Sequence, residues 1–413
     1  MKKKIAILGA GLAGATAARY LDKEKYDVTV IEKEDHVGGL CSTVKKEGYQ
    51  YDLGGHILFS RDPSILEEML SFLGDNVQQH HRNNKILHRG QLIKYPFENG
   101  FGALSKEVVS RCLRGYAVKD LNFRTRSAHF GEWLLDRYGD GFCEEYLFPY
   151  NKKIWKMPLE QISTDWVERL PDPSDDDIWN SAFGIETEGY LHQLDFWYPK
   201  EGGIQALVEA IMPREATSVA LNERAYSIGF AVKSDGSCGD AYIKTKQLVD
   251  RCIEKVHCSQ IIISTLPLKD LVQVLCYAPF GLHDAAKQLK HNSVRVSADP
   301  ETDIPDKIFA VYDANPSCPS HRRCNYGLLG GNCWIYEQTY RDTKPVRIKR
   351  EETDVEYAYP IHTHGRAGAV KTIRDYFEKQ NIYLCGRNGE HEYFNMDQVF
   401  VRAKALAERL NDA

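Results

Sequence analysis

The stretch that decides the fold runs from Lys4 to Glu32 and reads KIAILGAGLAGATAARYLDKEKYDVTVIE. It begins with a short apolar segment, residues 4–8, which is typical of a central strand in a parallel sheet. Residues 15–21 have the composition of a helix, and residues 28–31 form a second apolar segment. The order strand, glycine turn, helix and strand predicts the first unit of a dinucleotide-binding α/β fold.

Three glycines and one acidic residue make this prediction specific. Gly9, Gly11 and Gly14 follow the first strand with the spacing G-x-G-x-x-G. Gly9 permits the tight turn, Gly11 lets the backbone approach a pyrophosphate, and Gly14 lets the helix pack closely against the strand. The N-terminus of the helix offers free N–H groups and a partial positive charge to the phosphates. Glu32 ends the second strand, where its carboxylate can accept hydrogen bonds from both ribose hydroxyls.

The residues after Glu32 indicate which dinucleotide is bound. Residues 32–40 read EKEDHVGGL and residues 51–56 read YDLGGH. Both segments resemble motifs of a large family of FAD enzymes that includes amine oxidases, protoporphyrinogen oxidases and UDP-galactopyranose mutases. The resemblance implies FAD as the cofactor, with Gly38, Gly39 and Leu40 along its phosphates and ribityl chain, and with Gly54, Gly55 and His56 beside the isoalloxazine ring. A buried structural histidine is the alternative interpretation of His56.

The C-terminal residues are expected to complete the same site. Residues 382–384 form a short apolar strand, and an amphipathic helix follows residues 395–398 and runs to about Leu410. Asn395 or Asp397 would cap this helix, whose N-terminus can stabilise negative charge on a reduced flavin. The FAD contacts expected at this end are Gly386, Arg387, Asn395, Met396 and Asp397. Residues 260–266 predict a further buried strand that returns to the cofactor domain.

The middle of the chain resembles UDP-galactopyranose mutases. Residues 153–158 contain a K-x-W-x-x-P segment, residues 165–169 read DWVER, and residues 196–203 read FWYPKEGG. Segments near residues 320–322, 357–360 and 386–397 resemble the closing motifs of the same family in the same order. The W-x-x-E-R form is closer to the eukaryotic-type mutases. The resemblance spans nearly the whole chain, and its substrate motifs are shorter than its FAD motifs.

The resemblance implies a nucleotide-sugar mutase that contracts a pyranose ring to a furanose with no net redox change. N5 of the reduced flavin would act as the nucleophile at the anomeric carbon. Two arginines, Arg169 and Arg322, would hold the departing diphosphate, because a guanidinium pairs well with phosphate. The implied substrate contacts are Trp155, Arg169, Tyr312, Arg322, Tyr359 and Tyr393. The implied catalytic residues are His56, Arg169, Arg322, Tyr359 and Tyr393. Core packing for the aromatic residues and ion pairs for the arginines are the alternatives.

Two other functions stay open. The first is an FAD-dependent oxidoreductase of the amine oxidase or protoporphyrinogen oxidase type, which would take a hydride at the flavin. The second is an inactive scaffold that keeps the flavin fold. Only one G-x-G-x-x-G motif is present, so a mutase would need an external electron donor to reduce its flavin. The other expected partner is the small-molecule substrate, and a homodimer is one expectation for the assembly.

The expected fold class is α/β, with a Rossmann-like FAD-binding domain of the GR2 type, a helical substrate domain and a mixed β-sheet domain. Residues 1–62, 200–275 and 375–413 would form the FAD domain. Residues 63–171 would form the mostly helical domain, and residues 172–199 and 276–374 the mixed sheet that binds substrate. Strands are expected near residues 196–198, 308–312 and 332–336.

Composition and charge exclude other classes of protein. The net charge of −5 over 413 residues gives no dense basic face for a nucleic acid. The 11 cysteines have neither disulfide nor CxxC metal spacing, which favours a cytoplasmic protein with reduced thiols and no metal. Lys2 to Lys4 before an apolar run resemble a signal peptide, but the glycine spacing and Glu32 favour a strand. No apolar stretch approaches the about 18 residues of a membrane span.

Overall fold

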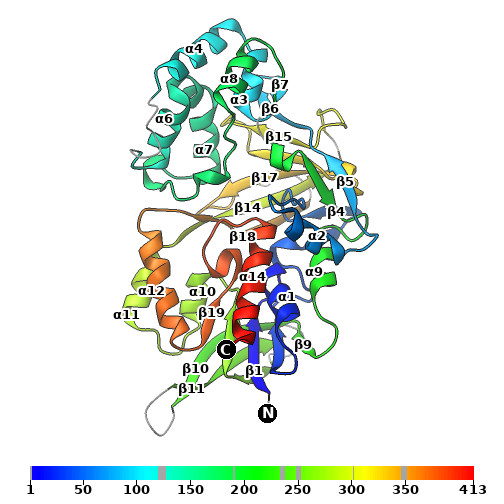
Figure 1. Ribbon diagram of the computed structural model, residues 1–413, viewed down its shortest axis with the longest axis vertical. Helices are drawn as coiled ribbons and strands as arrows, with labels where there is room; N and C mark the ends of the chain where they lie inside the picture. The colour runs from blue at the N-terminus through cyan, green and yellow to red at the C-terminus, as the bar shows by residue number, and fades with distance from the viewer. Residues whose placement is uncertain are drawn as a thin grey trace.

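The computed structural model describes residues 2–119, 127–188, 191–232, 238–247, 253–300, 302–345 and 351–413. Figure 1 shows three layers along the long axis of the molecule: a parallel sheet with its helices, a large mixed sheet, and a group of helices. This arrangement confirms the predicted α/β class with a Rossmann-like domain. Within the described ranges, none of the helices combines the length and the apolar character needed to cross a membrane.

The parallel sheet has the strand order β19-β13-β1-β2-β9. β1 is central and pairs on both sides, so that Ile5 lies opposite Val28 in β2 and Ile261 in β13. The sheet therefore joins N-terminal, middle and C-terminal segments of the chain. The strands are β1 (Lys3–Leu8), β2 (Tyr26–Ile31), β9 (Thr217–Ala220), β13 (Ile261–Ser264) and β19 (Ile382–Leu384). The strands predicted at residues 4–8, 28–31, 260–266 and 382–384 are thus confirmed.

Helices cover both faces of the parallel sheet because successive side chains of a strand point to opposite faces. Ile5 and Ile7 point to one face of the sheet and belong to one hydrophobic core, whereas Ala6 and Leu8 point to the opposite face and belong to a second core. The first face carries α1 (Leu12–Tyr20) and α14 (Met396–Asn411), with α9 (Gln205–Ile211) beside α1. The opposite face carries α10 (Leu268–Gln273), α11 (Phe280–Gln288) and α12 (Arg366–Glu378).

The large sheet has seven strands in the order β18-β14-β17-β16-β15-β6-β7. All neighbours are antiparallel except β15 and β6, which run parallel. The strands are β6 (Asn84–His88), β7 (Gln91–Lys94), β14 (Lys290–Asp299), β15 (Ala310–Asp313), β16 (Arg322–Asn325), β17 (Trp334–Tyr340) and β18 (Glu351–Ile361). The edge strand β18 is joined to the N-terminal part of the chain by a hydrogen bond of 3.3 Å between the hydroxyls of Tyr51 and Thr353.

The segment expected to be mostly helical, residues 63–171, also supplies a hairpin to this sheet. β6 and β7 are joined at Arg89 and Gly90, which have φ angles of 49° and 83°. Positive φ at both central residues of a two-residue loop is typical of a tight hairpin turn. Residues 63–171 therefore contribute strands to the large sheet as well as helices to the helical layer.

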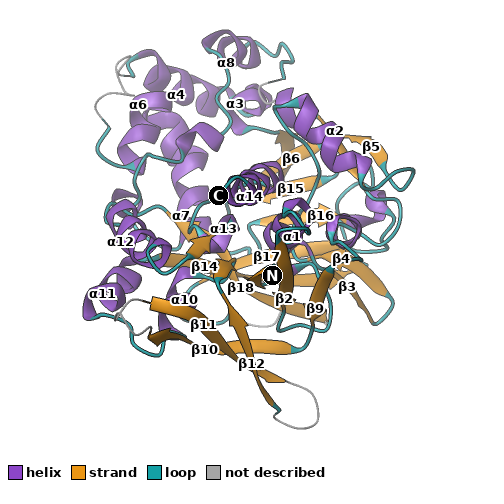
Figure 2. Cartoon of the chain, turned by 60° about the horizontal axis from the view of Figure 1, so that its bottom comes forward, coloured by secondary structure: helices purple, strands orange, loops and turns teal. Residues whose placement is uncertain are grey.

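Short elements complete the region between the layers. β8 pairs with β5 in a separate small sheet, although a place in the large sheet was expected for it. A three-stranded sheet projects from the parallel sheet, as Figure 2 shows. These elements are β3 (Thr43–Lys46), β4 (Tyr49–Asp52), α2 (Pro63–Ser71), β5 (Gln78–His81), β8 (Asp195–Tyr198), β10 (Glu223–Val232), β11 (Cys238–Gln247) and β12 (Glu254–Ser259).

The helical layer consists of α3 (Phe97–Gly100), α4 (Lys106–Ala117), α6 (Phe130–Phe142), α7 (Phe148–Trp155) and α8 (Asp175–Ala182). The acidic run Asp175–Asp177 forms the first turn of α8, with Ser174 as its N-cap. Acidic residues are favourable at a helix N-terminus. Asp172 accepts a hydrogen bond of 2.7 Å from Arg137 in the same layer. These acids therefore have partners within the helical layer.

Candidate active site

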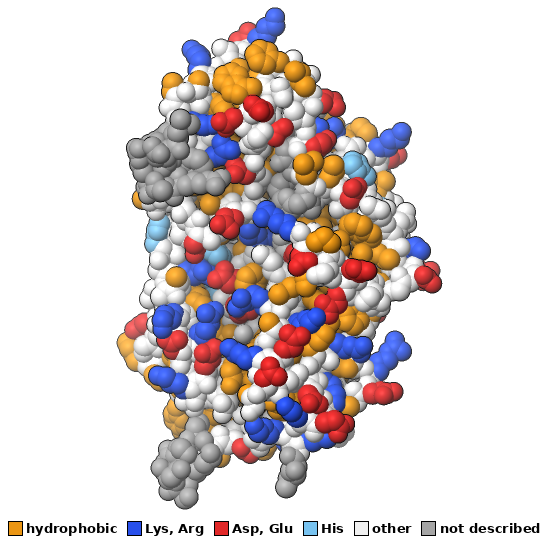
Figure 3. Space-filling model, in the orientation of Figure 1, with side chains coloured by type: hydrophobic (Ala, Val, Ile, Leu, Met, Phe, Trp, Pro, Cys, Tyr) orange, Lys and Arg blue, Asp and Glu red, His pale blue; other side chains and the backbone are white. Residues whose placement is uncertain are grey.

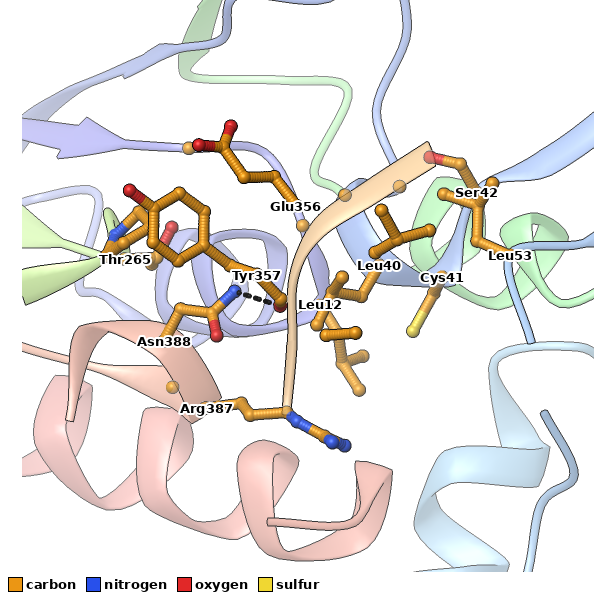
Figure 4. A pocket seen from close by; sticks show the side chains of 18 of the residues that line it. Leu12, Leu40, Cys41, Ser42, Leu53, Thr265, Glu356, Tyr357, Arg387 and Asn388 are labelled. Atoms are coloured by element: carbon orange, nitrogen blue, oxygen red, sulfur yellow. Dashed lines mark hydrogen bonds between the residues drawn. The ribbon is translucent and has the colours of Figure 1, made fainter. Parts of the chain in front are cut away.

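A cleft of about 1310 Å³ lies between the parallel sheet and the edge strand β18 of the large sheet. Most of its lining comes from three segments far apart in the chain, residues 8–59, 223–274 and 385–399, and the rest comes from the large sheet, including Arg322, Glu337 and residues 353–359. Figure 4 shows part of it, with Leu12 and Leu40 close together and Tyr357 beside Asn388. The predicted site residues that line the cleft are Gly9, Gly11, Glu32, Gly38, Gly39, Leu40, Gly54, Gly55, His56, Arg322, Tyr359, Gly386, Arg387, Tyr393, Asn395 and Met396.

The glycine turn between β1 and α1 brings backbone atoms unusually close. Gly9 has a φ of +102°, a conformation that only glycine adopts readily. A Cβ atom on Gly14 would lie 1.9 Å from the carbonyl oxygen of Gly9. Gly14 does not line the cleft and instead allows α1 to start directly against β1. The N-terminus of α1 consequently faces the cleft at Gly11 and Leu12.

Glu32 lies at the end of β2 with only 6% of its surface exposed. Its carboxylate accepts hydrogen bonds from the backbone N–H of Ala10 at 2.7 Å and of Glu34 at 3.0 Å. These bonds fix the carboxylate between the glycine turn and the loop after β2. The same carboxylate lines the cleft and keeps acceptor capacity for a ligand hydroxyl.

A second pair of glycines crosses over the first. Gly38 and Gly11 form an isolated parallel bridge, and a Cβ atom on Gly39 would lie 3.0 Å from the Cα atom of Gly11. Gly38 has a φ of +144°. The two glycine segments thus form a narrow cradle of backbone at the N-terminus of α1, where a phosphate can approach without meeting side chains.

The C-terminal part of the cleft is held by an ion pair between the buried Glu390 and Arg402, which is about half exposed. Glu390 is 3% exposed and accepts hydrogen bonds from the backbone N–H of Gly386 at 3.1 Å and from Nε of Arg402 at 2.7 Å. The pair connects the loop after β19 to α14. The first residue of α14 follows Asn395, whose backbone N–H donates to the Gln398 side chain at 2.9 Å. The N-terminus of α14 therefore points to the cleft, as the sequence predicted for residues 395–398.

Arginines and tyrosines gather at one end of the cleft. The guanidinium carbons of Arg169 and Arg387 lie 4.0 Å and 4.4 Å from the ring centre of Tyr393. The ring of Tyr359 lies 5.5 Å from that of Tyr393. Arg169 does not itself line the cleft, since it donates a hydrogen bond to the side chain of Asn395 instead. Cation–π contacts of this kind keep the arginines in place without neutralising their charge.

Arg322 also lines the cleft, but it has an acidic partner that the sequence did not reveal. Its Nε and Nη2 atoms donate to the two carboxylate oxygens of Glu337 at 2.8 Å and 2.7 Å. Glu337 is fully buried and lines the cleft as well. The two residues are direct neighbours on β16 and β17. Only the register of these strands, which no local motif encodes, shows that they meet.

His56 lies half-buried beside these arginines. Burial, together with the positive charges of Arg322 and Arg387, lowers its pKa to about 3. The ring is therefore neutral at physiological pH. Its Nδ1 atom and the Nε atom of Arg387 are buried without a hydrogen-bond partner among the described residues. Buried polar atoms without partners inside a cleft indicate that a ligand group completes the site.

The remaining predicted residues lie outside the cleft lining. Trp155 is 4% exposed and packs edge-on against Tyr393 and Tyr359, behind the arginine cluster. Tyr312 stacks on Tyr95 with ring centres 4.6 Å apart. Asp397 accepts a hydrogen bond of 2.9 Å from Ser60 and so joins α14 to the loop before α2.

Comparison with known proteins supports this fold. A family model described as an NAD(P)-binding Rossmann-like domain matches residues 7–73. The dTDP-fucopyranose mutase of Escherichia coli is 26% identical over 198 residues, which are 45% of this chain and 52% of that protein. The 4,4'-diapophytoene desaturase of Staphylococcus aureus is 32% identical over 77 residues, which are 19% of this chain and 15% of that protein. The aligned regions thus span about half of the first relative and less of the second.

Solved structures are similar over nearly the whole chain. A crystal structure of reduced UDP-galactopyranose mutase has a TM-score of 0.83 and 22% identity, and the match covers 99% of this chain and 94% of that one. A proposed protoporphyrinogen oxidase from Exiguobacterium has a TM-score of 0.71 and 16% identity, with 100% and 99% covered. The chain therefore has the fold of UDP-galactopyranose mutase and its flavoprotein relatives, as its sequence motifs predicted.

Proposed function

We propose that the cleft binds FAD and that the chain is a nucleotide-sugar mutase, an isomerase that converts the pyranose ring of a nucleotide-linked sugar into a furanose. The observation that carries this proposal is the pair of arginines, Arg322 and Arg387, that line the cleft beside Tyr359 and Tyr393, with Arg169 packed against the ring of Tyr393. An oxidase that takes a hydride from an amine does not need arginines that bind a substrate diphosphate.

The residues present fit FAD. Glu32 would hold the adenosine ribose, and the crossed glycines with the N-terminus of α1 would hold the diphosphate. The flavin half would then extend towards His56, Arg387 and the N-terminus of α14. The cleft of about 1310 Å³ exceeds the ~300–1,000 Å³ of ordinary small-ligand pockets, which is consistent with a dinucleotide and a substrate in one continuous space.

Bound in its reduced form, the flavin supplies a nucleophilic nitrogen for the anomeric carbon of the sugar. The chain supplies the rest. Arg169, Arg322 and Arg387 offset the charge of the nucleoside diphosphate that leaves and returns. Burial and the neighbouring Glu337 raise the pKa of Tyr359, so its hydroxyl stays protonated and can donate a hydrogen bond to a phosphate oxygen. The flavin would need an external electron donor to reach its reduced form.

The comparisons support this proposal at two levels. The E. coli relative is named for a nucleotide-sugar mutase, and the structure with a TM-score of 0.83 is named for another. An FAD-dependent oxidoreductase remains the second candidate, because the proposed protoporphyrinogen oxidase has a TM-score of 0.71. Both candidates share the cofactor and differ in whether the arginines bind a substrate diphosphate.

The decisive experiment is a binding titration of UDP, dTDP and their sugars against the flavin-loaded protein, oxidised and after reduction with dithionite. Arg169→Ala and Arg322→Ala are measured in parallel. Arg323→Ala is the matched control, since Arg323 adjoins Arg322 but pairs with Asp303 and Asp313 outside the cleft. We expect binding that strengthens on reduction and is lost in the first two variants only. Absence of nucleotide binding in both redox states, with flavin bleached by an amine or hydroxy compound, would establish the oxidoreductase instead.

A further inference from the structure

The strongest unassigned feature of the cleft is the carboxylate of Glu337. It is fully buried, and both of its oxygens accept hydrogen bonds from Arg322, at 2.8 Å and 2.7 Å. Such a fork-to-fork pair fixes the plane and the direction of a guanidinium. Both carboxylate oxygens are occupied by Arg322, so the action of Glu337 on a ligand in the cleft passes through that arginine.

Glu337 has a second partner, Gly55, in the loop that follows β4 and lines the cleft. The backbone N–H of Gly55 donates to Oε1 of Glu337 at 3.1 Å. A Cβ atom on Gly55 would lie 3.3 Å from the guanidinium carbon of Arg322, so the loop and the arginine are already in close contact. The carboxylate therefore holds together the Gly54–His56 loop and the arginine on β16.

The pairing leaves a defined part of Arg322 for a ligand. The bonds to Glu337 use Nε and Nη2, whereas Nη1 makes no hydrogen bond to any residue in the described part of the chain. The side chain keeps 22% of its surface exposed. A ligand in the cleft can therefore contact Nη1 of Arg322, and the positive charge of this arginine is partly offset by the buried carboxylate of Glu337.

We propose that Glu337 is a positioning residue. It orients the Nη1 edge of Arg322 towards the diphosphate of the substrate, and its negative charge lowers the affinity of Arg322 for that diphosphate. The inference rests on the proposed function for the identity of the ligand. A mutase must release the nucleoside diphosphate from the sugar and then return it, so an arginine that binds the anion too tightly slows the cycle. Offsetting part of the charge keeps binding and release in balance.

The test compares Glu337→Gln with the wild type in the flavin-loaded, dithionite-reduced protein, with UDP and dTDP as the probes. Glutamine keeps the shape and removes the charge. We expect affinity for the better probe to rise about tenfold, the effect of uncovering a partly buried cation. With the UDP- or dTDP-linked sugar that the wild type accepts as substrate, we also expect kcat to fall about tenfold and KM to fall with it. A residue that merely supports the fold would weaken binding and lower the melting temperature together.

Two further variants make the result specific. Glu352→Gln removes a carboxylate from another arginine pair of the same sheet, with Arg295 at 3.2 Å, outside the cleft lining, and should leave affinity unchanged. Glu337→Asp keeps the charge but shortens the reach, so affinity should stay within about twofold while kcat still falls. This variant decides the question if Glu337→Gln yields no folded holoprotein, because a wild-type kcat in Glu337→Asp overturns the inference.

The outcomes separate the inference from the proposed function. If the wild type binds UDP or dTDP and Glu337→Gln binds them with equal or lower affinity, the role assigned to Glu337 is wrong and the mutase proposal stands. If the wild type binds neither nucleotide in either redox state, the mutase proposal fails, and the role of Glu337 in holding a diphosphate fails with it.

Discussion

At the scale of single residues, the site depends on places where a side chain has no room. The Cα of Gly14 faces the carbonyl of Gly9 so closely that any Cβ would sit 1.9 Å from its oxygen. The contact is between two backbone segments, so no side chain can rotate away to relieve it. Helix α1 would have to move away from β1, and the phosphate-binding end of the cleft would move with it.

Gly14→Ala should therefore lower the free energy of unfolding by about 2 kcal/mol or more and reduce the FAD content of the purified protein. The measurement is urea unfolding together with the ratio of flavin to protein absorbance. Gly368→Ala is the matched control, because Gly368 lies in α12 with nothing within 4 Å of its added Cβ. It should be neutral or stabilise by up to about 1 kcal/mol. Equal effects of the two changes would contradict the role of close packing at Gly14.

At the scale of elements, the last helix is held in place by one buried carboxylate. Glu390 joins the start of the loop after β19 to α14 through Gly386 and Arg402. Gly386 has a φ of +83°, and a Cβ there would lie 2.6 Å from the Cβ of Ala13 in α1. The carboxylate thus keeps α1, α13 (Gly386–Gly389) and α14 in one arrangement around the cleft.

Replacing Glu390 with alanine should lower the free energy of unfolding by about 2 kcal/mol, because the buried N–H of Gly386 loses its acceptor and Arg402 loses its partner. Urea unfolding of Glu390→Ala measures the loss, and fluorescence of released flavin on dilution shows whether the cleft loosens at the same time. Glu408→Ala, an exposed position on the same helix, should change stability by less than about 0.5 kcal/mol. A Glu390→Ala protein as stable as the control would show that Arg402 and Gly386 find other partners.

At the scale of the whole molecule, several histidines are kept neutral by burial. Burial and nearby positive charges lower the pKa of His56 and of His391 to about 3 and that of His291 to about 4. In the unfolded chain a histidine has a pKa of about 6.5. The unfolded state therefore binds protons first as the pH falls, so stability is greatest above pH about 6.5 and decreases towards pH about 4.

Each such histidine should lower the free energy of unfolding by about 2 kcal/mol between pH 7 and pH 5. His391→Asn tests one of them, since His391 has a φ of +51° that asparagine tolerates. The variant should be less stable at pH 7 but show a shallower decline in unfolding free energy on acidification. His81→Asn, at an exposed site, is the control. A decline as steep in His391→Asn as in the wild type would mean that this histidine is not neutral in the folded protein.

Cofactor removal should act on the molecule as a whole, because the cleft joins three segments of the chain. FAD at about one hundred times its dissociation constant should add about 2.7 kcal/mol to the stability of the apoprotein, seen as a higher melting temperature. FMN lacks the adenosine half that Glu32 and the glycine turn would hold. It should stabilise less at the same concentration, and an equal shift with FMN would argue against the adenosine site.

The sequence predicted the parallel sheet and its glycine turns better than the large sheet and the residues that it brings to the cleft, for a physical reason. The glycines and Glu32 act through backbone turns and strand ends, which short-range spacing encodes, so their elements appear where expected. The hairpin at Arg89 and Gly90 carried a local signal as well, a polar pair between two apolar segments. The pairing of Arg322 with Glu337 depends instead on the register of β16 and β17. Likewise, Trp155 and Tyr312 are aromatic residues whose burial in the core no motif distinguishes from a substrate contact.

The contact between α1 and α14 has a consequence for how the protein is made. A ribosome releases the chain from its N-terminus, and the first strand and its glycine turn emerge early. The wall formed by residues 385–399 emerges almost four hundred residues later. The cleft of a nascent chain therefore lacks its C-terminal wall for most of synthesis. We expect the chain to bind flavin only when translation is nearly finished. Premature termination before residue 385 would remove α14 and the C-terminal wall of the cleft, so the product should be colourless.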